Sequence, residues 1–338
     1  AVSPQIISGT GRTARASASY KVVTMYQLNY LFPNAIVVDG KTVYEPGTQI
    51  RYLQYNGSDA FYDGMSKKAC YCMASVLADP AGAVSPSDKF IINKRLNYVL
   101  YNGVRRIGHN AYNSSYRSGS WEKDYYITAV AVHLTNMDLG NETKVSLSTL
   151  EASVNASNVD GAKDTWKLIK KLYTDAKTAE GTNSSGEIST PDYLLTSSNT
   201  TDSWSKQSDG TWNSSKFTVS VSDVYAVSDR KGTVVDDTTG KLVTGVSLIY
   251  NTDDVHSGFY VKATDESYKS MGKSGTTLRI ISTVVAHSLS GTTFKPNVST
   301  KQPVIAMMFG ESEKDKSVTA YARSSYTPPN GSVKVIKK

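Results

Sequence analysis

Cysteine is scarce in this sequence. Cys70 and Cys72 are the two cysteines among 338 residues, and a single residue separates them. A disulfide between them would close a strained ring, far from ordinary disulfide geometry. The chain therefore has no disulfide framework, which fits either the cytosol or the surface of a Gram-positive bacterium.

Long hydrophobic runs are also missing. No apolar stretch reaches membrane-spanning length, and a mean hydropathy of −0.34 with 39% hydrophobic residues is typical of a soluble globular protein. The chain does not open with a charged segment followed by an apolar one, so we expect any signal peptide to be absent or already removed. We also expect no membrane contact within this chain.

Motifs for metal, nucleotide and serine-hydrolase chemistry are absent as well. The histidines, at 109, 133, 256 and 287, are far apart, and one Cys-x-Cys pair supplies too few ligands for a structural zinc. The sequence has no phosphate-binding loop, no dinucleotide fingerprint and no Gly-x-Ser-x-Gly turn. We therefore expect no metal and no cofactor.

Positive charge is present but not concentrated. The net charge is +7, and the lysines and arginines are scattered singly or in pairs such as Arg105-Arg106. Nucleic-acid-binding modules gather basic residues on one face. We therefore do not expect a nucleic-acid partner.

Tyrosine and turn residues are abundant. The chain has 22 tyrosines, many serines and threonines, and repeated Asn-Gly and Asp-Gly pairs, a mixture that favours twisted sheets with solvated outer faces. We expect a flexible leader over 1–18, then strands over 20–32, 35–46 and 48–57, the second of them a hairpin that turns at its Asp-Gly pair. The expected fold is mainly β with a smaller helical part.

Two segments show helical patterns. The mixed spacing in 87–101 predicts a short helix with Ser87 as its N-cap and Gly103 as its stop. A clearer helix is predicted over 162–179, where apolar residues recur at i, i+3, i+6 and i+7. The apolar segment 124–135 fits either a buried strand or a buried helix, and periodicity does not separate the two.

The second half of the chain has a different composition. Residues 181–215 are almost entirely Ser, Thr, Asn, Gly and Asp, as in a linker or in long solvated loops. Alternating or short apolar blocks follow, as in a β-sandwich. We therefore expect one domain over 19–207 and a β-sandwich-like domain over 208–338. The alternative is one large domain whose sheet is completed by the later strands.

Reactive side chains occur in two of these segments. Cys70 and Cys72 lie in the run Ala-Cys-Tyr-Cys-Met, and the segment 124–135 carries Thr128 and His133. An imidazole could remove the thiol proton and create a nucleophile. The alternative is that these are packing residues, since cysteine is often buried and a histidine in an apolar run is often part of the core.

The same segments carry a family resemblance. Tyr71-Cys72-Met73 is an aromatic-Cys-aliphatic motif, and residues 125–133 (YYITAVAVH) place Thr-x-x-Ala after two aromatic residues, with Ala129 57 positions after Cys72. This ordered pair resembles the two motifs of the thioester domains of Gram-positive surface adhesins, whose second motif is usually Thr-Gln-x-Ala. The resemblance spans roughly 60–180, and it implies a thioester-domain-like β-sandwich or barrel with helices, followed by or merged with further strands.

The resemblance also implies a chemistry. The sulfur of Cys72 would bond to the side-chain carbonyl of a glutamine at position 129, with loss of ammonia, and the thioester would later acylate an amine on a host ligand. Cys72 should then lie close to residue 129, because fixing both side chains supplies a high effective molarity. Cys70 is the alternative nucleophile, since the aromatic-Cys motif can be aligned with either cysteine of the Cys-Tyr-Cys run.

Position 129 holds alanine, whose methyl group offers no carbonyl to a thiol. As written, the chain cannot form the thioester at this position. Two explanations fit: a natural homologue that has lost the bond, or a deliberate replacement, which the otherwise intact motif favours. The resemblance gives Thr128 a positioning role through its hydroxyl and His133 a proton-shuttle role. The alternatives are a β-branched strand residue and a packing residue.

The function implied is that of the target-binding tip of a cell-wall-anchored adhesin, monomeric and active in host attachment and virulence, with the anchor beyond this chain. Its partner would be a host surface or matrix protein, or another amine-bearing ligand. A single-use module of this kind is not an enzyme. The alternatives are a non-covalent β-sandwich adhesin or lectin, and an acyl-transfer enzyme that uses Cys72 and His133. The second half could carry an internal crosslink of its own at Lys216.

Overall fold

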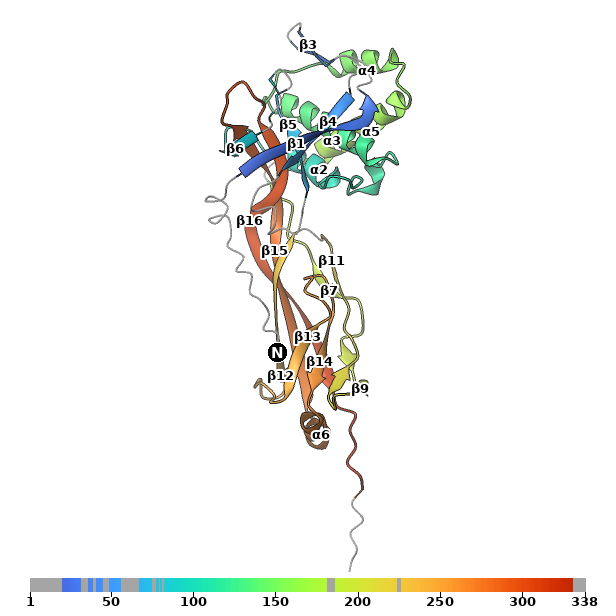
Figure 1. Cartoon of the computed structure of the whole chain (residues 1–338), viewed down its shortest axis with the longest axis vertical. Coiled ribbons are helices and arrows are strands. Elements are labelled where there is room, and N and C mark those ends of the chain that lie inside the picture. Colours follow the sequence, from blue (N-terminus) through green and yellow to red (C-terminus); the bar gives the residue numbers. More distant parts are fainter. Residues whose placement is uncertain are drawn as a thin grey trace, which may run out of the picture. The chain divides into compact units, whose positions relative to one another are not determined.

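The computed structural model describes residues 20–31, 36–38, 41–44, 49–55, 67–74, 77–78, 80, 82–180, 186–223 and 226–330. The leader expected over 1–18 lies outside these residues. Strands account for 37% of the structure and helices for 26% (Figure 1). The expected fold class, mainly β with a smaller helical part, is confirmed.

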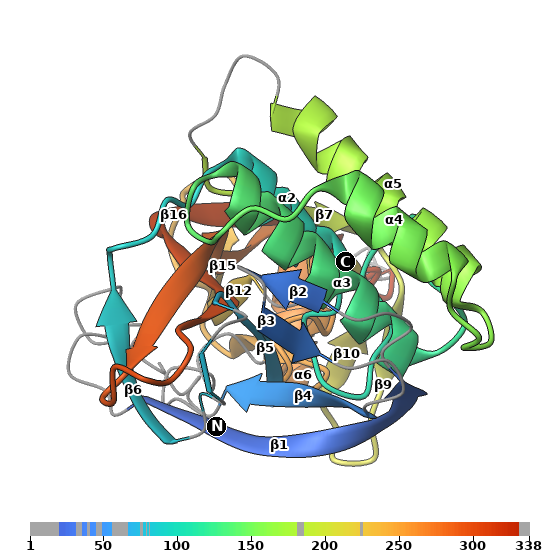
Figure 2. The same cartoon turned by 90° about the horizontal axis from the view of Figure 1, so that it is seen from above.

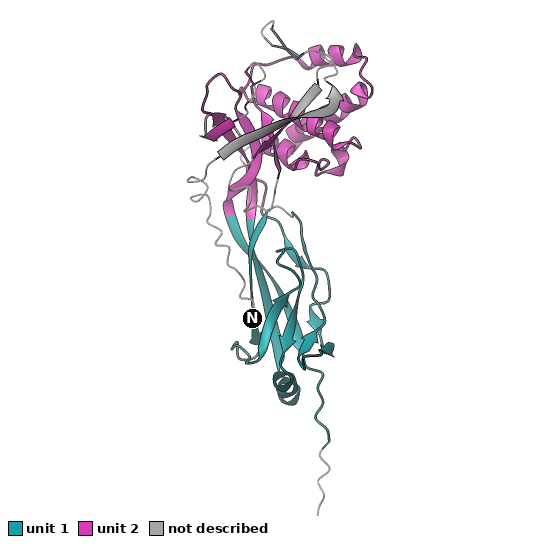
Figure 3. Cartoon of the chain, viewed as in Figure 1, with its two compact units in different colours: residues 1–9, 191–286, 313–338 teal, residues 10–190, 287–312 magenta. Residues whose placement is uncertain are grey.

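The chain forms two compact units (Figure 3). The helical unit comprises residues 10–190 and 287–312, and the β unit comprises 1–9, 191–286 and 313–338. The sequence places its boundary near 208, whereas the units divide after residue 190 and a later segment returns to the helical unit. Two long strands, β15 (Thr277–Pro296) and β16 (Val304–Arg323), each contribute residues to both units.

The helical unit is built on a curled antiparallel sheet. Its strands are β1 (Tyr20–Leu31), β4 (Gln49–Tyr55), β5 (Lys68–Cys72), β6 (Gly82–Ser87) and parts of β15 and β16. The pairing order is β15-β6-β1-β4-β5-β16, and β15 also pairs with β16, so the pairings form a closed circuit. A separate hairpin joins β2 (Ile36–Val38) to β3 (Lys41–Tyr44). These elements confirm the strands expected over 20–32, 35–46 and 48–57.

Strand β5 lies inside this sheet. Its Cys70 is opposite Leu53 of β4 on one side and opposite Ala306 of β16 on the other. The pairing with β16, a strand from far along the chain, places β5 between two neighbours. One face of the sheet packs into a buried group that we call the inner cluster: Leu53, Tyr55, Cys70, Val84, Phe294, Val304, Ala306 and Met308.

Helices cover another part of this unit, grouped on one side of β1 and β4 (Figure 2). They are α2 (Lys94–Asn102), the 3-10 helix η2 (Ser114–Tyr116), α3 (Trp121–Asp138), α4 (Leu147–Asn155) and α5 (Ala162–Glu180). Helix α5 confirms the helix predicted over 162–179, and it packs against α2 and α3.

Helix α2 is shorter than its sequence pattern predicts. The side chain of Asn93 accepts a hydrogen bond from the backbone N–H of Leu96 at 3.1 Å, and this contact caps the helix. Ser87, the expected N-cap, instead ends β6 and lies opposite Thr293 of β15, so that prediction is wrong. Gly103 follows the last turn, as expected, and donates its N–H to the carbonyl of Val99.

Helix α3 settles the assignment of the segment 124–135. Ser120 caps its N-terminus, and two acidic residues lie in its first turn, where the helix dipole favours them. Buried side chains lie all around the helix, from Asp124 to Met137. A helix that is buried on nearly every side has no broad polar face, which is why periodicity could not distinguish it from a strand.

The β unit contains shorter strands and one helix. Its elements are β7 (Tyr193–Leu195), β8 (Thr200–Thr201), β9 (Trp204–Lys206), β10 (Trp212–Ser214), β11 (Val219–Val221), β12 (Val227–Asp236), β13 (Val246–Tyr250), β14 (Phe259–Ala263) and α6 (Asp265–Ser274), with parts of β15 and β16. The segment 181–215 supplies four of these strands rather than a linker or loops alone. Later strands pair with them, as β11 does with β7 and β14 with β10, and that pairing orders an otherwise polar sequence.

Candidate functional site at strand β5 and helix α3

The two motifs found in the sequence meet in the structure. Tyr71 of β5 stacks on Tyr125 of α3, with ring centres 4.9 Å apart and ring planes 26° apart. Tyr52 of β4 packs edge-on against Trp121 of the same helix, with ring centres 5.2 Å apart. Segments that are more than 50 positions apart in the chain are thereby held together by aromatic contacts.

The hydroxyl of Tyr125 fastens α3 to the sheet. It accepts a hydrogen bond from the backbone N–H of Leu53 at 3.0 Å and donates one to the carbonyl of Cys70 at 2.8 Å. Leu53 and Cys70 are partners across β4 and β5, so this hydroxyl bridges the two strands at the cysteine motif. Burial raises the pKa of Tyr125 well above its ordinary value. The phenol therefore stays protonated and remains a donor.

We expect Tyr125→Phe to lower the free energy of unfolding by about 1–3 kcal/mol, because it leaves a buried N–H and a buried carbonyl without the bridging hydroxyl. Tyr71→Phe is the matched control. The Tyr71 hydroxyl donates to the carbonyl of Val104 and is also hydrogen-bonded to the Thr128 side chain, but it bridges no pair of strands, so we expect a smaller loss of about 1 kcal/mol. Urea unfolding measures both. Equal stabilities for Tyr125→Phe and the unchanged protein would show that the bridge does not contribute.

Thr128 lies one turn of α3 from Asp124 and holds the chain that leaves α2. Its hydroxyl donates to the carbonyl of Asp124 at 2.8 Å and accepts from the N–H of Val104 at 3.1 Å. Gly103 approaches so closely that a Cβ added there would lie 2.3 Å from Cγ2 of Thr128. Thr128 thus fixes the turn at residues 103–104, and Tyr71 is bonded to the same turn through Val104.

We expect Gly103→Ala to destabilise the protein by about 1–3 kcal/mol, because the new methyl group overlaps Thr128 in a closely packed interior. In a Thr128→Ser background the Cγ2 methyl is gone and the hydroxyl can rotate, so the cost of Gly103→Ala should fall. Thermal unfolding of the two single variants and the double variant measures this coupling. A neutral Gly103→Ala would contradict the close contact.

The cysteines face away from α3. Alternate residues of a strand point to opposite faces, and Tyr71 is the residue that faces the helix. Cys70 is fully buried in the inner cluster, and Cys72, which is half-buried, packs against the same cluster. Neither cysteine is in a disulfide. Burial, followed by the proximity of Cys72, raises the pKa of the Cys70 thiol well above its ordinary value, so this thiol stays protonated.

Ala129 lies on α3 one turn beyond Tyr125 and is half-buried. The structure therefore places residue 129 on the helix that packs against β5, but it does not turn a thiol toward that helix. Strand alternation gives the helix-facing position to Tyr71, and the expected approach of Cys72 to residue 129 stays a prediction.

His133 lies farther along α3 and is paired with a carboxylate. Its Nδ1 atom lies 2.8 Å from a carboxylate oxygen of Glu142. Burial alone would lower the pKa of His133, but the charge and the hydrogen bond of Glu142 outweigh it and raise that pKa. The imidazole is thus held as a partner of Glu142, which suits a packing role more directly than a proton shuttle to a thiol.

Two classes of site are not found in the described part of the chain. Within the described ranges, no group of three or more His, Cys, Asp and Glu side chains could hold a metal ion. None of the helices in those ranges is long and apolar enough to cross a membrane.

No protein-family model and no curated protein matches the sequence. Among solved structures, the Bacillus anthracis TIE protein is similar, with a TM-score of 0.37 and 13% sequence identity. The match covers 90% of this chain and 48% of that one. The present chain thus spans about half the length of that protein.

Proposed function

We propose that this chain is a ligand-binding module of a Gram-positive surface adhesin of the thioester-domain type, in a form that does not make the thioester. One observation carries the proposal. The two sequence motifs meet in the fold, where Tyr125 of the second motif stacks on Tyr71 and bonds to the carbonyl of Cys70 in the first. This contact supports a neighbourhood in which a Cys-Gln bond would form, with Ala129 proposed at the position of the glutamine.

With glutamine at 129, the bond would form by acyl transfer. The Cys72 sulfur would attack the side-chain carbonyl carbon of the glutamine, the C–N bond would break, and ammonia would leave with the thiol proton. A host amine would then attack the thioester carbonyl, form an amide and release the Cys72 thiol. The product is a permanent attachment to a host surface or matrix protein, without turnover.

Cys72 suits this role better than Cys70. The Cys70 carbonyl accepts a hydrogen bond from Tyr125, and the Cys70 side chain is fully buried in the inner cluster. Cys72 is the last residue of β5 and is only half-buried. Turning its thiol toward α3 needs a rearrangement confined to the end of the strand, whereas Cys70 would require the centre of the sheet to open.

A fluorescent primary amine tests the proposal. We expect the Ala129→Gln variant to take up one amine per chain, in a bond that survives denaturation. The unchanged chain and the Ala129→Gln/Cys72→Ala variant should take up none, and these are the controls. If Ala129→Gln folds normally and remains unlabelled, the thioester proposal fails.

A second candidate function is non-covalent adhesion. Its supporting observation is that both cysteine side chains pack on the inner cluster rather than on α3. In this case the chain would bind a glycan or peptide reversibly, and binding would persist in Cys72→Ala and be lost in denaturant. Partner, monomeric state and surface location are proposed in both cases on the sequence resemblance.

A further inference from the structure

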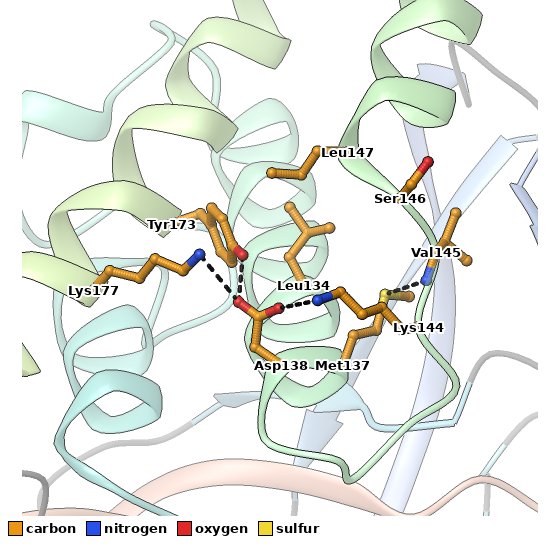
Figure 4. A pocket seen from close by; sticks show the side chains of 9 residues that line it. All are labelled: Leu134, Met137, Asp138, Lys144, Val145, Ser146, Leu147, Tyr173 and Lys177. Atoms are coloured by element: carbon orange, nitrogen blue, oxygen red, sulfur yellow. Dashed lines mark hydrogen bonds and ion pairs between the residues drawn. The ribbon is translucent and has the colours of Figure 1, made fainter.

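A small cavity lies in the helical unit at the end of α3 (Figure 4). Its volume is about 260 Å³, and it opens between the last turn of α3, the segment 144–146, the start of α4 and helix α5. Four apolar side chains form much of its wall: Leu134, Met137, Val145 and Leu147. A wall of this kind favours a ligand with an apolar body, and the volume limits that body to about the size of one amino-acid side chain.

Asp138 lies at the base of this cavity. Its carboxylate accepts hydrogen bonds from the Arg95 guanidinium and from the Tyr173 hydroxyl. Only 13% of its side chain is exposed. Burial alone would raise the pKa of Asp138, but the hydrogen bonds from Tyr173 and Arg95, and the positive charges of Arg95 and Lys177, outweigh it and lower that pKa. The carboxylate is therefore ionised and already well satisfied.

Two lysines approach the same carboxylate less closely. The Nζ atoms of Lys144 and Lys177 each lie 3.5 Å from an oxygen of Asp138. Figure 4 shows them on either side of it. Their side chains are 72% and 48% exposed. Each ammonium has three N–H donors, so each keeps donors available to a ligand that enters the cavity.

The local charge is unbalanced. Of the residues that line the cavity, Lys144 and Lys177 contribute two positive charges and Asp138 contributes one negative charge, which leaves an excess of one positive charge beside an apolar wall. An entering cation would be repelled by this excess. A singly charged anion suits the cavity better than a multiply charged one, because Asp138 at the base repels added negative charge.

We propose that this cavity is a binding site for a carboxylate carried on a small branched or aromatic apolar group, held by Lys144 and Lys177 through its charge and by Leu134 and Leu147 through its apolar part. Two sources share this chemistry: a free organic acid, and the C-terminal carboxylate of a polypeptide that ends in an apolar residue. The site is non-covalent and independent of Cys72 and position 129, so it does not rest on the function proposed above.

Calorimetric titration of the full chain tests the site. The probes are 4-methylpentanoate for the free acid and the peptide acetyl-Gly-Gly-Leu with a free C-terminus. The matched neutral controls are 4-methylpentanamide and the same peptide as its amide. We expect at least one acid to bind, its amide to bind about tenfold more weakly, and inorganic phosphate not to compete. A preference for acid or peptide identifies the source.

Variants then assign the binding to this cavity. Lys144→Met and Lys177→Met remove the charge but keep a side chain of similar length. Each should lower the affinity for the acid by about tenfold, the loss expected for one charge-assisted hydrogen bond. Lys167→Met is the matched control on α5, since Lys167 is 77% exposed and paired with Asp164, and it should bind as the unchanged chain does. Acids that bind no better than amides, phosphate that competes equally, or affinities unchanged in both cavity variants would overturn the proposal.

Discussion

Asp138→Asn is expected to lower the free energy of unfolding by about 3–5 kcal/mol, because it leaves the buried Arg95 guanidinium without a counter-charge. The Arg95 side chain is 8% exposed and that of Asp138 is 13% exposed, so the pair is largely shielded from water. The same carboxylate also accepts the Tyr173 hydroxyl. One substitution therefore loosens contacts among α2, α3 and α5 together.

The control is a surface carboxylate on α5. Asp164 is 84% exposed and pairs with Lys167 at 3.4 Å, so Asp164→Asn should cost no more than about 0.5 kcal/mol. Urea unfolding of both variants measures the contrast. An Arg95→Met/Asp138→Asn double variant should be more stable than the sum of the two single losses predicts. Similar losses for Asp138→Asn and Asp164→Asn would contradict the buried ion pair.

The effect of Asp138 also depends on pH. Because its folded-state pKa is lowered, the stability that it contributes is fully present above the unfolded-state pKa of about 3.9. That contribution is lost as pH falls through the folded-state value. The difference between the unchanged protein and Asp138→Asn should therefore be constant at neutral pH and shrink below about pH 4.

Local sequence predicts the elements that local interactions decide. The β2–β3 hairpin follows from its Asp-Gly pair, and α5 follows from its apolar stripe. The partners of β5 could not be predicted, because pairing with β16 depends on residues far along the chain. Helix α3 could not be distinguished from a strand because most of its side chains are buried and no polar face interrupts the apolar run.

The candidate site was predictable in part. Spacing and residue type identified Cys72, Thr128, Ala129 and His133 as candidates, and the two segments that carry Cys72 and Ala129 are adjacent in the fold. The strand period of two implies that Tyr71 faces opposite to the cysteines. Which of those faces meets α3 depends on tertiary packing. The bridging role of the Tyr125 hydroxyl has no sequence signature, since it arises only where a helix crosses two paired strands.

The proposed chemistry predicts that the chain forms no thioester with Ala129 and a complete thioester when glutamine is restored at that position. With glutamine at 129 the two reacting groups share one folded molecule, and their effective molarity would be far above that of any free thiol. The Cys70→Ala variant should leave the reaction intact, whereas Cys72→Ala should abolish it, because Cys72 lies at the end of β5 and Cys70 is buried within the sheet.

The intact mass of denatured Ala129→Gln protein tests this claim most directly. We predict a mass below that of the sequence by one ammonia, with the deficit kept in Ala129→Gln/Cys70→Ala and absent in Ala129→Gln/Cys72→Ala. A folded Ala129→Gln protein with the full sequence mass, and with both thiols open to alkylation after denaturation, would contradict it.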